Sequence, residues 1–165
     1  MFTRFTAFSA LLVICHILFV ATAYAEESAP DFSLPTFPDG ANISLQDFKG
    51  RVVYLDFWAT WCPPCLKSFP WMDEMHARYK DEGLTIIAVS VDKKRELIEQ
   101  FINKTEPTFT IAHDPAGKIA KAYKLRGMPS SYLIDRNGQL VKTHMGFRNK
   151  DKAKLEAAIQ ALLEK

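Results

Sequence analysis

Two cysteines separated by two prolines are the residues of this sequence best suited to chemistry. Cys62 and Cys65 follow a β-branched and aromatic run, Val52–Trp58, and precede a segment with helical spacing, so Cys62 should open a helix. The partial positive charge of a helix N-terminus favours a thiolate over a thiol. The i, i+3 spacing lets the sulfurs form a disulfide with little backbone rearrangement. Cys62 could then attack a partner's disulfide, and Cys65 could resolve the mixed disulfide by attacking Cys62.

The residues around the pair shape its surroundings. Pro63 and Pro64 stiffen the segment and lack N–H groups, so the Cys62 sulfur keeps only the amide and thiol of Cys65 as nearest local donors. This pattern leaves open whether the pair reduces or oxidises its partners. Trp61, directly before Cys62, is expected at the rim of the site as an apolar contact for partners.

Other uses of the pair need residues that the sequence does not supply nearby. A structural zinc site needs four ligands, and His76, His113 and His144 show no ligand spacing. A c-type haem attachment motif needs His after the second cysteine, where this chain has Leu66. A purely structural disulfide this closely spaced would add little stability. We therefore expect a redox pair that uses no metal and no other cofactor.

The composition is that of a globular domain. Of 165 residues, 48% are hydrophobic and 24% are charged, which argues against a disordered or collagen-like chain. The 21 basic and 19 acidic side chains give a net charge of +2, with no long run of like charge. A nucleic-acid-binding protein would need a stronger basic footprint, so that class is excluded.

The first 25 residues have the three parts of a secretory signal peptide. Arg4 is their only charged residue, residues 7–20 are largely apolar, and Ala23-Tyr24-Ala25 supplies a small-x-small exit. We expect cleavage after Ala25 and an exported domain at residues 26–165. An uncleaved segment that anchors the domain to the membrane is the alternative. In an oxidising compartment a lone, closely spaced cysteine pair forms a disulfide unless something reduces it.

Strand and helix patterns alternate along the exported part, which indicates one α/β domain. Strands are expected at residues 52–58, 84–91, 108–111, 130–134 and 140–144. Helices are expected after the cysteines, at 93–103 with Leu97, Ile98 and Phe101 inward, at 115–123, and at the C-terminus with Leu155, Ala158, Ile159 and Leu162 on one face. The turn signal Pro38-Asp39-Gly40 predicts a hairpin within 29–43, and His113-Asp114 is expected to cap the third helix.

Two motifs together resemble the thioredoxin superfamily. They are Asp-Phe-Trp-Ala-Thr-Trp-Cys-Pro-Pro-Cys at 56–65 and Arg-Gly-Met-Pro at 126–129. With the hairpin and the segments 88–92 and 130–138, residues 29–165 resemble the exported TlpA/ResA/CcmG-like (DsbE-like) thiol-disulfide oxidoreductases of bacteria. This resemblance implies a three-layer α/β fold, in which helices flank a central mixed sheet. It also implies an N-terminal β-hairpin and a strand–helix insertion around Thr108–Tyr123.

The resemblance also implies roles for residues outside the cysteine pair. Pro129 matches the family's cis-proline beside the cysteines, and the main chain of Met128 would pair with an extended substrate segment. Asp56 matches a buried aspartate that accepts, through water, the proton of the resolving thiol, here Cys65. The alternatives are a trans Pro129 in an ordinary turn and an Asp56 that reaches solvent.

Two positions depart from the family pattern. Thioredoxin pairs its buried aspartate with a lysine, but the matching residue here is Ala88, so an unpaired Asp56 should have a raised pKa. Reductases of the cytochrome-maturation branch usually carry glutamate three residues after the second cysteine, where this chain has Ser68. Ser68 weakens an assignment to cytochrome c maturation and moves proton transfer onto Asp56.

The function implied by the resemblance is reduction of partner-protein disulfides in the periplasm, as in cytochrome c maturation or oxidase metal-site assembly. Electrons would come from a membrane thiol transporter, and a monomer is expected. A dithiol oxidase that introduces disulfides and a metallochaperone that holds copper between the two thiolates stay open. A peroxidase is disfavoured, because Ala59 and Leu55 stand where peroxiredoxins carry Thr or Ser and Pro.

Overall fold

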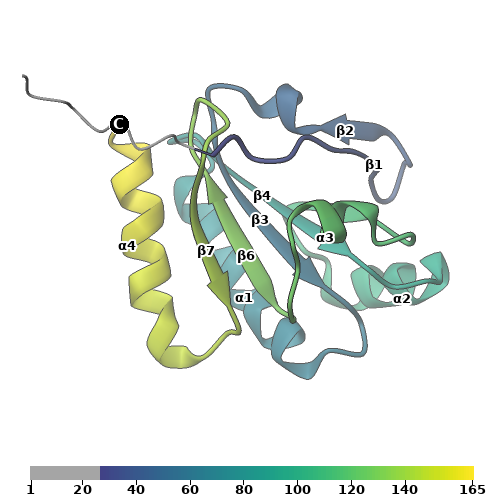
Figure 1. Ribbon diagram of the computed structural model, residues 1–165. Helices are drawn as coiled ribbons and strands as arrows, with labels where there is room; N and C mark the ends of the chain where they lie inside the picture. The colour runs from purple at the N-terminus through teal and green to yellow at the C-terminus, as the bar shows by residue number, and fades with distance from the viewer. Residues whose placement is uncertain (1–26) are drawn as a thin grey trace, which may run out of the picture.

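The computed structural model describes residues 27–165, in which a five-stranded mixed sheet is covered on both faces (Figure 1). In spatial order the sheet contains β5 (Thr110–His113), β4 (Leu84–Ser90), β3 (Val52–Trp58), β6 (Ser130–Ile134) and β7 (Leu140–Met145). Strands β3, β4 and β5 are parallel, whereas β6 and β7 are antiparallel to their neighbours. β1 (Ser33–Pro35) and β2 (Asn42–Ser44) form a separate antiparallel pair. The expected three-layer fold with an N-terminal hairpin is confirmed.

The predicted signal peptide, residues 1–25, lies outside the described residues. Across residues 27–165, no helix combines the length and apolar character that a bilayer crossing requires.

Helices of different length cover the two faces of the sheet. α1 (Pro63–Tyr79), α2 (Arg95–Thr105) and α4 (Lys152–Leu163) pack against one face, where Trp58, Met72 and Ile159 share a core. The short α3 (Lys118–Ala122), the hairpin and the 3-10 turn η1 (Leu45–Phe48) cover the other face. β3 is buried along its whole length because its side chains alternate between both cores. Figure 1 shows α4 and β7 on one flank and the hairpin above the sheet.

Two sequence-based expectations about the helices need correction. α3 begins at Lys118 rather than near residue 115, because the Asp114 carboxylate accepts hydrogen bonds from three amides, those of Lys118, Ile119 and Ala120. The expected capping by Asp114 is thereby confirmed. Leu97 does not face the core, since its exposed fraction is 40%. On α2 the buried face runs through Ile98, Phe101 and Ile102, at i, i+3, i+4 spacing, and Leu97 lies outside it.

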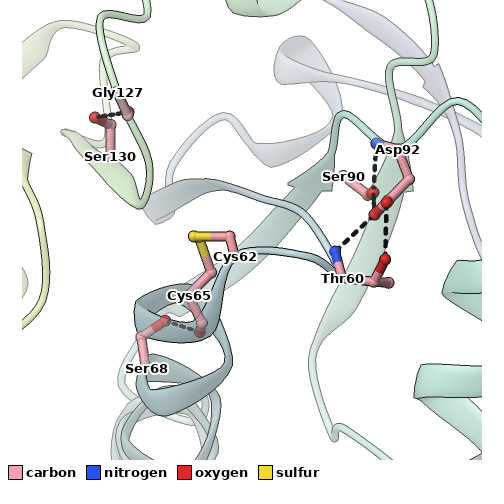
Figure 2. Close-up of a disulfide and its surroundings, with 8 residues drawn as sticks. All are labelled: Thr60, Cys62, Cys65, Ser68, Ser90, Asp92, Gly127 and Ser130. Atoms are coloured by element: carbon pink, nitrogen blue, oxygen red, sulfur yellow. Dashed lines mark hydrogen bonds between the residues drawn. A yellow bond between two sulfur atoms is a disulfide. The ribbon is translucent and has the colours of Figure 1, made fainter.

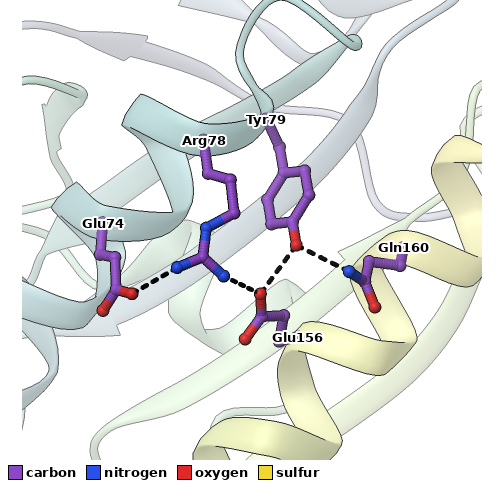
Figure 3. A network of polar contacts seen from close by, with 5 residues as sticks. All are labelled: Glu74, Arg78, Tyr79, Glu156 and Gln160. Atoms are coloured by element: carbon purple, nitrogen blue, oxygen red, sulfur yellow. Dashed lines mark hydrogen bonds and ion pairs between the residues drawn. The ribbon is translucent and has the colours of Figure 1, made fainter.

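Side chains on α1 and α4 join these two helices in one polar network (Figure 3). The Tyr79 hydroxyl donates to Glu156 Oε1 at 2.7 Å and accepts from Gln160 Nε2 at 2.8 Å. Arg78 contacts the same Glu156 carboxylate and also Glu74, at 2.6 Å. This network fixes α4 alongside α1, the helix that begins at the cysteine pair.

Two arginines bind main-chain carbonyls at the end of the sheet opposite the cysteines. Arg51 donates to Thr85 Oγ1 at 2.6 Å, to the Leu84 oxygen at 2.8 Å and to the Lys80 oxygen at 2.9 Å. Arg136 donates to carbonyl oxygens of three separate segments, those of Gly50, Glu82 and Leu163. Each guanidinium has enough donors to join several loops at once.

Candidate active site

Strand β3 leads directly into the loop that carries the cysteines. Its last residue, Trp58, is fully buried and lies against the rings of Phe69 and Phe101. Four residues later Cys62 takes an extended conformation as the N-cap of α1, with its amide donating to the Ala59 oxygen at 3.1 Å. A rigid strand and a packed helix thus hold both ends of a short loop, which limits the positions available to Cys62.

Cys62 and Cys65 form a disulfide at the start of α1 (Figure 2). Their Cα atoms are 5.3 Å apart, within the range that a disulfide spans without backbone movement. Cys62 is 6% exposed and Cys65 is fully buried. Trp61 is 64% exposed, and Pro63 and Pro64 are also exposed. The expected pairing is therefore confirmed, and any partner thiol or disulfide must approach from the Cys62 side.

The first turn of α1 offers the Cys62 sulfur no main-chain donor. Pro63 and Pro64 have no N–H, and the next two amides donate to the Cys62 carbonyl oxygen, Cys65 at 2.9 Å and Leu66 at 3.2 Å. Four N–H groups at a helix start normally remain free to bind an anion. Here no main-chain N–H of the first turn donates to the sulfur, so the helix dipole and, in the reduced pair, the Cys65 thiol are left to stabilise a Cys62 thiolate.

A buried aspartate that the sequence analysis did not select holds the loop before the cysteines. Asp92 follows β4 and is 1% exposed. Its carboxylate accepts from the Thr60 amide at 2.9 Å, the Thr60 hydroxyl at 2.8 Å and the Ser90 hydroxyl at 2.8 Å (Figure 2). One sequence signal could have pointed to Asp92, namely an acid directly after a buried strand. Because the parallel neighbours β3 and β4 end at the same edge of the sheet, an acid that follows β4 lies beside the loop that follows β3.

Asp56 lies in the middle of β3, on the face that packs against α1 and α4. Its neighbours on that face are Tyr54 and Trp58, which share a hydrophobic core with Cys65. Across the sheet it pairs with Ala88 on β4 and Ser131 on β6. Asp56 is therefore placed on the core side of the sheet that also contains Cys65.

Burial dominates the electrostatics of Asp56. The residue is 2% exposed, and its Oδ2 atom has no hydrogen-bond partner among the described residues. Loss of hydration disfavours the charged carboxylate and raises its pKa well above 3.8. Burial, followed by the nearby Asp56 charge, likewise raises the pKa of Tyr54. Ala88 stands across from Asp56 where a basic partner would lower the pKa of the carboxyl again, so the effect of burial on this pKa is not offset there.

The Met128–Pro129 peptide bond is cis. Ser130 pairs with Phe57, so Pro129 lies next to the end of β3, where the cysteine loop begins. Its carbonyl oxygen accepts from the Gly146 amide at 2.7 Å, and Ser130 Oγ donates to the Gly127 oxygen at 2.7 Å (Figure 2). Among residues 27–165 the main-chain groups of Met128 make no hydrogen bond, so they are open to a bound polypeptide segment.

Three other polar residues take structural positions. Ser68 is buried and its hydroxyl donates to the Cys65 carbonyl oxygen at 2.7 Å, so no acid occupies this place. His113 is buried, and its Nε2 lies 2.8 Å from the Asp92 carbonyl oxygen. Within the described range, no three His, Cys, Asp or Glu side chains are grouped to hold a metal ion.

Comparisons with known proteins place this geometry in a family. The chain matches the Redoxin family over residues 24–159. It is 38% identical over 123 residues to the thiol-disulfide oxidoreductase ResA of Oceanobacillus iheyensis, covering 73% of this chain and 64% of that relative. A ResA of Bacillus anthracis is 38% identical over 125 residues, 76% of this chain and 72% of its own length. The chain therefore spans less than two thirds of the first relative.

Solved structures agree with this placement. A crystal structure from Chlorobium tepidum, described as thiol:disulfide interchange protein DsbE, is 46% identical and has a TM-score of 0.81, covering 84% of this chain and 96% of that one. The exposed lipoprotein thioredoxin Etrx1 of Streptococcus pneumoniae is 34% identical with a TM-score of 0.69, covering 82% and 100%. The chain belongs to the Redoxin family, as a TlpA/ResA/CcmG-like thiol-disulfide oxidoreductase of the thioredoxin superfamily.

Proposed function

We propose that the protein acts outside the cytosol as a reductant of disulfides in partner proteins. The observation that carries the direction is the first turn of α1, in which no main-chain N–H reaches the Cys62 sulfur. A strongly oxidising dithiol protein is one whose reduced form is stabilised, and hydrogen bonds to the thiolate supply such stabilisation. Without them the reduced pair gives up its electrons more readily. The relatives named oxidoreductases or interchange proteins support protein disulfides as substrates.

The reaction transfers two electrons from the dithiol to the partner. The Cys62 thiolate attacks one sulfur of the partner's disulfide, so a bond to Cys62 forms, the partner's S–S bond breaks, and the released thiolate takes up a proton. In the fraction of molecules in which Asp56 is ionised, Cys65 then passes its proton through water to the Asp56 carboxylate and attacks Cys62 Sγ. The Cys62–Cys65 disulfide forms and the partner leaves as a dithiol. A membrane thiol transporter would return two electrons to the pair, and no further cofactor is needed.

The reduction potential tests the direction. Equilibration with glutathione should give a value near the roughly −270 mV of thioredoxin, and a value near the roughly −120 mV of DsbA would establish the oxidase alternative instead. The variant Pro63→Ala/Pro64→Ala restores two N–H groups at the helix start. Its potential should be higher than that of the native protein, and an unchanged potential would contradict the role given to the prolines. Lys49→Ala, remote from the cysteines, is the matched control.

Trapping identifies the substrate. In cells that express the full chain as Cys65→Ser, the mixed disulfide at Cys62 cannot be resolved and should accumulate. Mass spectrometry should find cytochrome or oxidase subunits whose metal or haem sites contain a cysteine pair. Cys62→Ser/Cys65→Ser is the control and should capture nothing. Recovery of a membrane thiol transporter alone would contradict the assigned substrates while supporting the electron donor.

The proposed location depends on the first 25 residues. Small-residue spacing at Ala23 and Ala25 supports cleavage, and one relative is described as an exposed lipoprotein. Mass spectrometry of the protein recovered from cell fractions should show a periplasmic chain that starts at Glu26. A full-length chain in the membrane fraction would support the anchored alternative.

A further inference from the structure

A groove next to the cis-proline combines an apolar floor with two cations. It has a volume of about 320 Å³ and lies between the end of α3 and the strands β6 and β7. Tyr123, Tyr132 and Met145 contribute apolar surface, and the Met145 side chain is 62% exposed. Ser130, directly after Pro129, also lines this groove. A polypeptide bound along Met128 and Pro129 would therefore continue into the groove.

Lys124 and Arg126 give the groove its positive charge. Both side chains are exposed, and Arg126 forms no ion pair within residues 27–165. Lys124 lies 3.5 Å from Glu27, the groove's single acidic lining residue, but both side chains are more than two-thirds exposed. Such an exposed pair is worth little and is readily exchanged for another carboxylate.

Further cations surround the cysteine end of the sheet. The exposed basic residues of the nearby loops and helix starts are Lys67, Lys93, Lys94 and Lys118. The acids Asp92 and Asp114 of the same loops are buried, where they bind Thr60 and the amides that begin α3, so they do not face a partner directly. Glu96, in the first turn of α2, is exposed but is only one charge against several. The exposed charged side chains of these loops are therefore mostly basic.

We propose that this groove binds an acidic, extended segment of the substrate polypeptide, within a few residues of its reactive cysteine. The segment would pair with the free main-chain groups of Met128, place carboxylates against Lys124 and Arg126, and lay an apolar side chain on Met145. Complementary charge of this kind raises the rate of encounter and selects among partners. The inference rests on the proposed function, because it names the class of partner that the cysteine pair serves.

Three matched peptides test the inference. Each has one cysteine in a disulfide with a chromophoric thiol, and the neighbouring positions carry Glu, Gln or Lys. Release of the chromophore by the reduced protein should be fastest for the Glu peptide and slowest for the Lys peptide, by about tenfold or more at low salt. Raising the ionic strength from roughly 0.01 M to 0.15 M shortens the screening length from about 30 Å to 8 Å and should narrow this difference.

Charge-neutral variants locate the effect. In Lys124→Gln/Arg126→Gln the rates for the three peptides should converge. In Lys49→Gln/Lys80→Gln, which removes two exposed cations at the opposite end of the molecule, the ranking should persist. Equal rates for the three peptides with the native protein, or a ranking that survives Lys124→Gln/Arg126→Gln, would overturn the groove as the binding site. Failure to react with any peptide would instead contradict the proposed function.

Discussion

Replacing Asp56 by asparagine should remove a pH-dependent loss of stability from this protein. Burial raises the pKa of the Asp56 carboxyl in the folded state, while the unfolded chain keeps the ordinary value near 3.8. Above that value the unfolded state loses its proton and the folded state keeps it. The folded state then binds more protons, so the free energy of unfolding falls as pH rises, until pH passes the folded-state pKa.

The expected slope follows from one proton. Between the two pKa values the native protein should lose about 1.4 kcal/mol of its free energy of unfolding per pH unit because of Asp56. Asp56→Asn cannot ionise, so its advantage over the native chain should grow by that slope. The buried amide lacks partners, which adds a pH-independent cost of about 1–3 kcal/mol. The informative quantity is therefore the change with pH of the difference in free energy of unfolding between the two proteins, rather than the size of that difference at one pH.

Urea denaturation of the oxidised proteins at about pH 5, 6, 7 and 8 would measure that slope. Asp81→Asn, at an exposed position just after α1, is the matched control and should show no comparable slope. A difference between native protein and Asp56→Asn that stays constant over this range would refute the reasoning. It would mean that the carboxylate is ionised and stabilised in the folded protein.

Other substitutions test the supports of the site. Asp92→Ala leaves the Thr60 amide and hydroxyl without their acceptor, so it should lower the free energy of unfolding by about 2–4 kcal/mol and slow thiol exchange at Cys62; unchanged insulin reduction would contradict this. Ile159→Ala empties a fully buried position, and urea denaturation should show a loss of about 2–5 kcal/mol. Gly83→Ala should cost about 1–3 kcal/mol in the same assay, because Gly83 has a φ of 107°, a backbone conformation that a residue with a Cβ adopts only with strain.

Periodicity predicted most of the fold. The strand at residues 52–58 has the expected bounds because a continuous β-branched and aromatic run ends at a polar loop. The start of α3 was misplaced because Pro115 is a frequent first-turn residue, whereas the amides that Asp114 caps lie further along. Leu97 was wrongly assigned to the core, since the face that α2 buries is decided by its packing against Trp58 and Phe69.

Some features of the candidate site were also predictable from the sequence, and others were not. Spacing predicted the Cys62–Cys65 disulfide, and the family resemblance predicted the cis Pro129 and the burial of Asp56 beside Ala88. The role of Asp92 did not follow from local sequence, because its carboxylate acts on a loop thirty-two positions away. Interactions between strand ends become visible only when the order of strands in the sheet is known.

The two arginines at the remote end of the sheet, Arg51 and Arg136, help to keep the domain folded whether or not the cysteine pair is oxidised. A covalent cross-link stabilises a fold largely by restricting the unfolded chain, and a ring closed between residues only three apart restricts it little. The folded domain is therefore stabilised by its two hydrophobic cores and by the hydrogen bonds of the Arg51 and Arg136 guanidinium groups, rather than by the disulfide. The sulfur–sulfur bond is free to open and close over many turnovers while the architecture persists, as a reusable electron carrier requires.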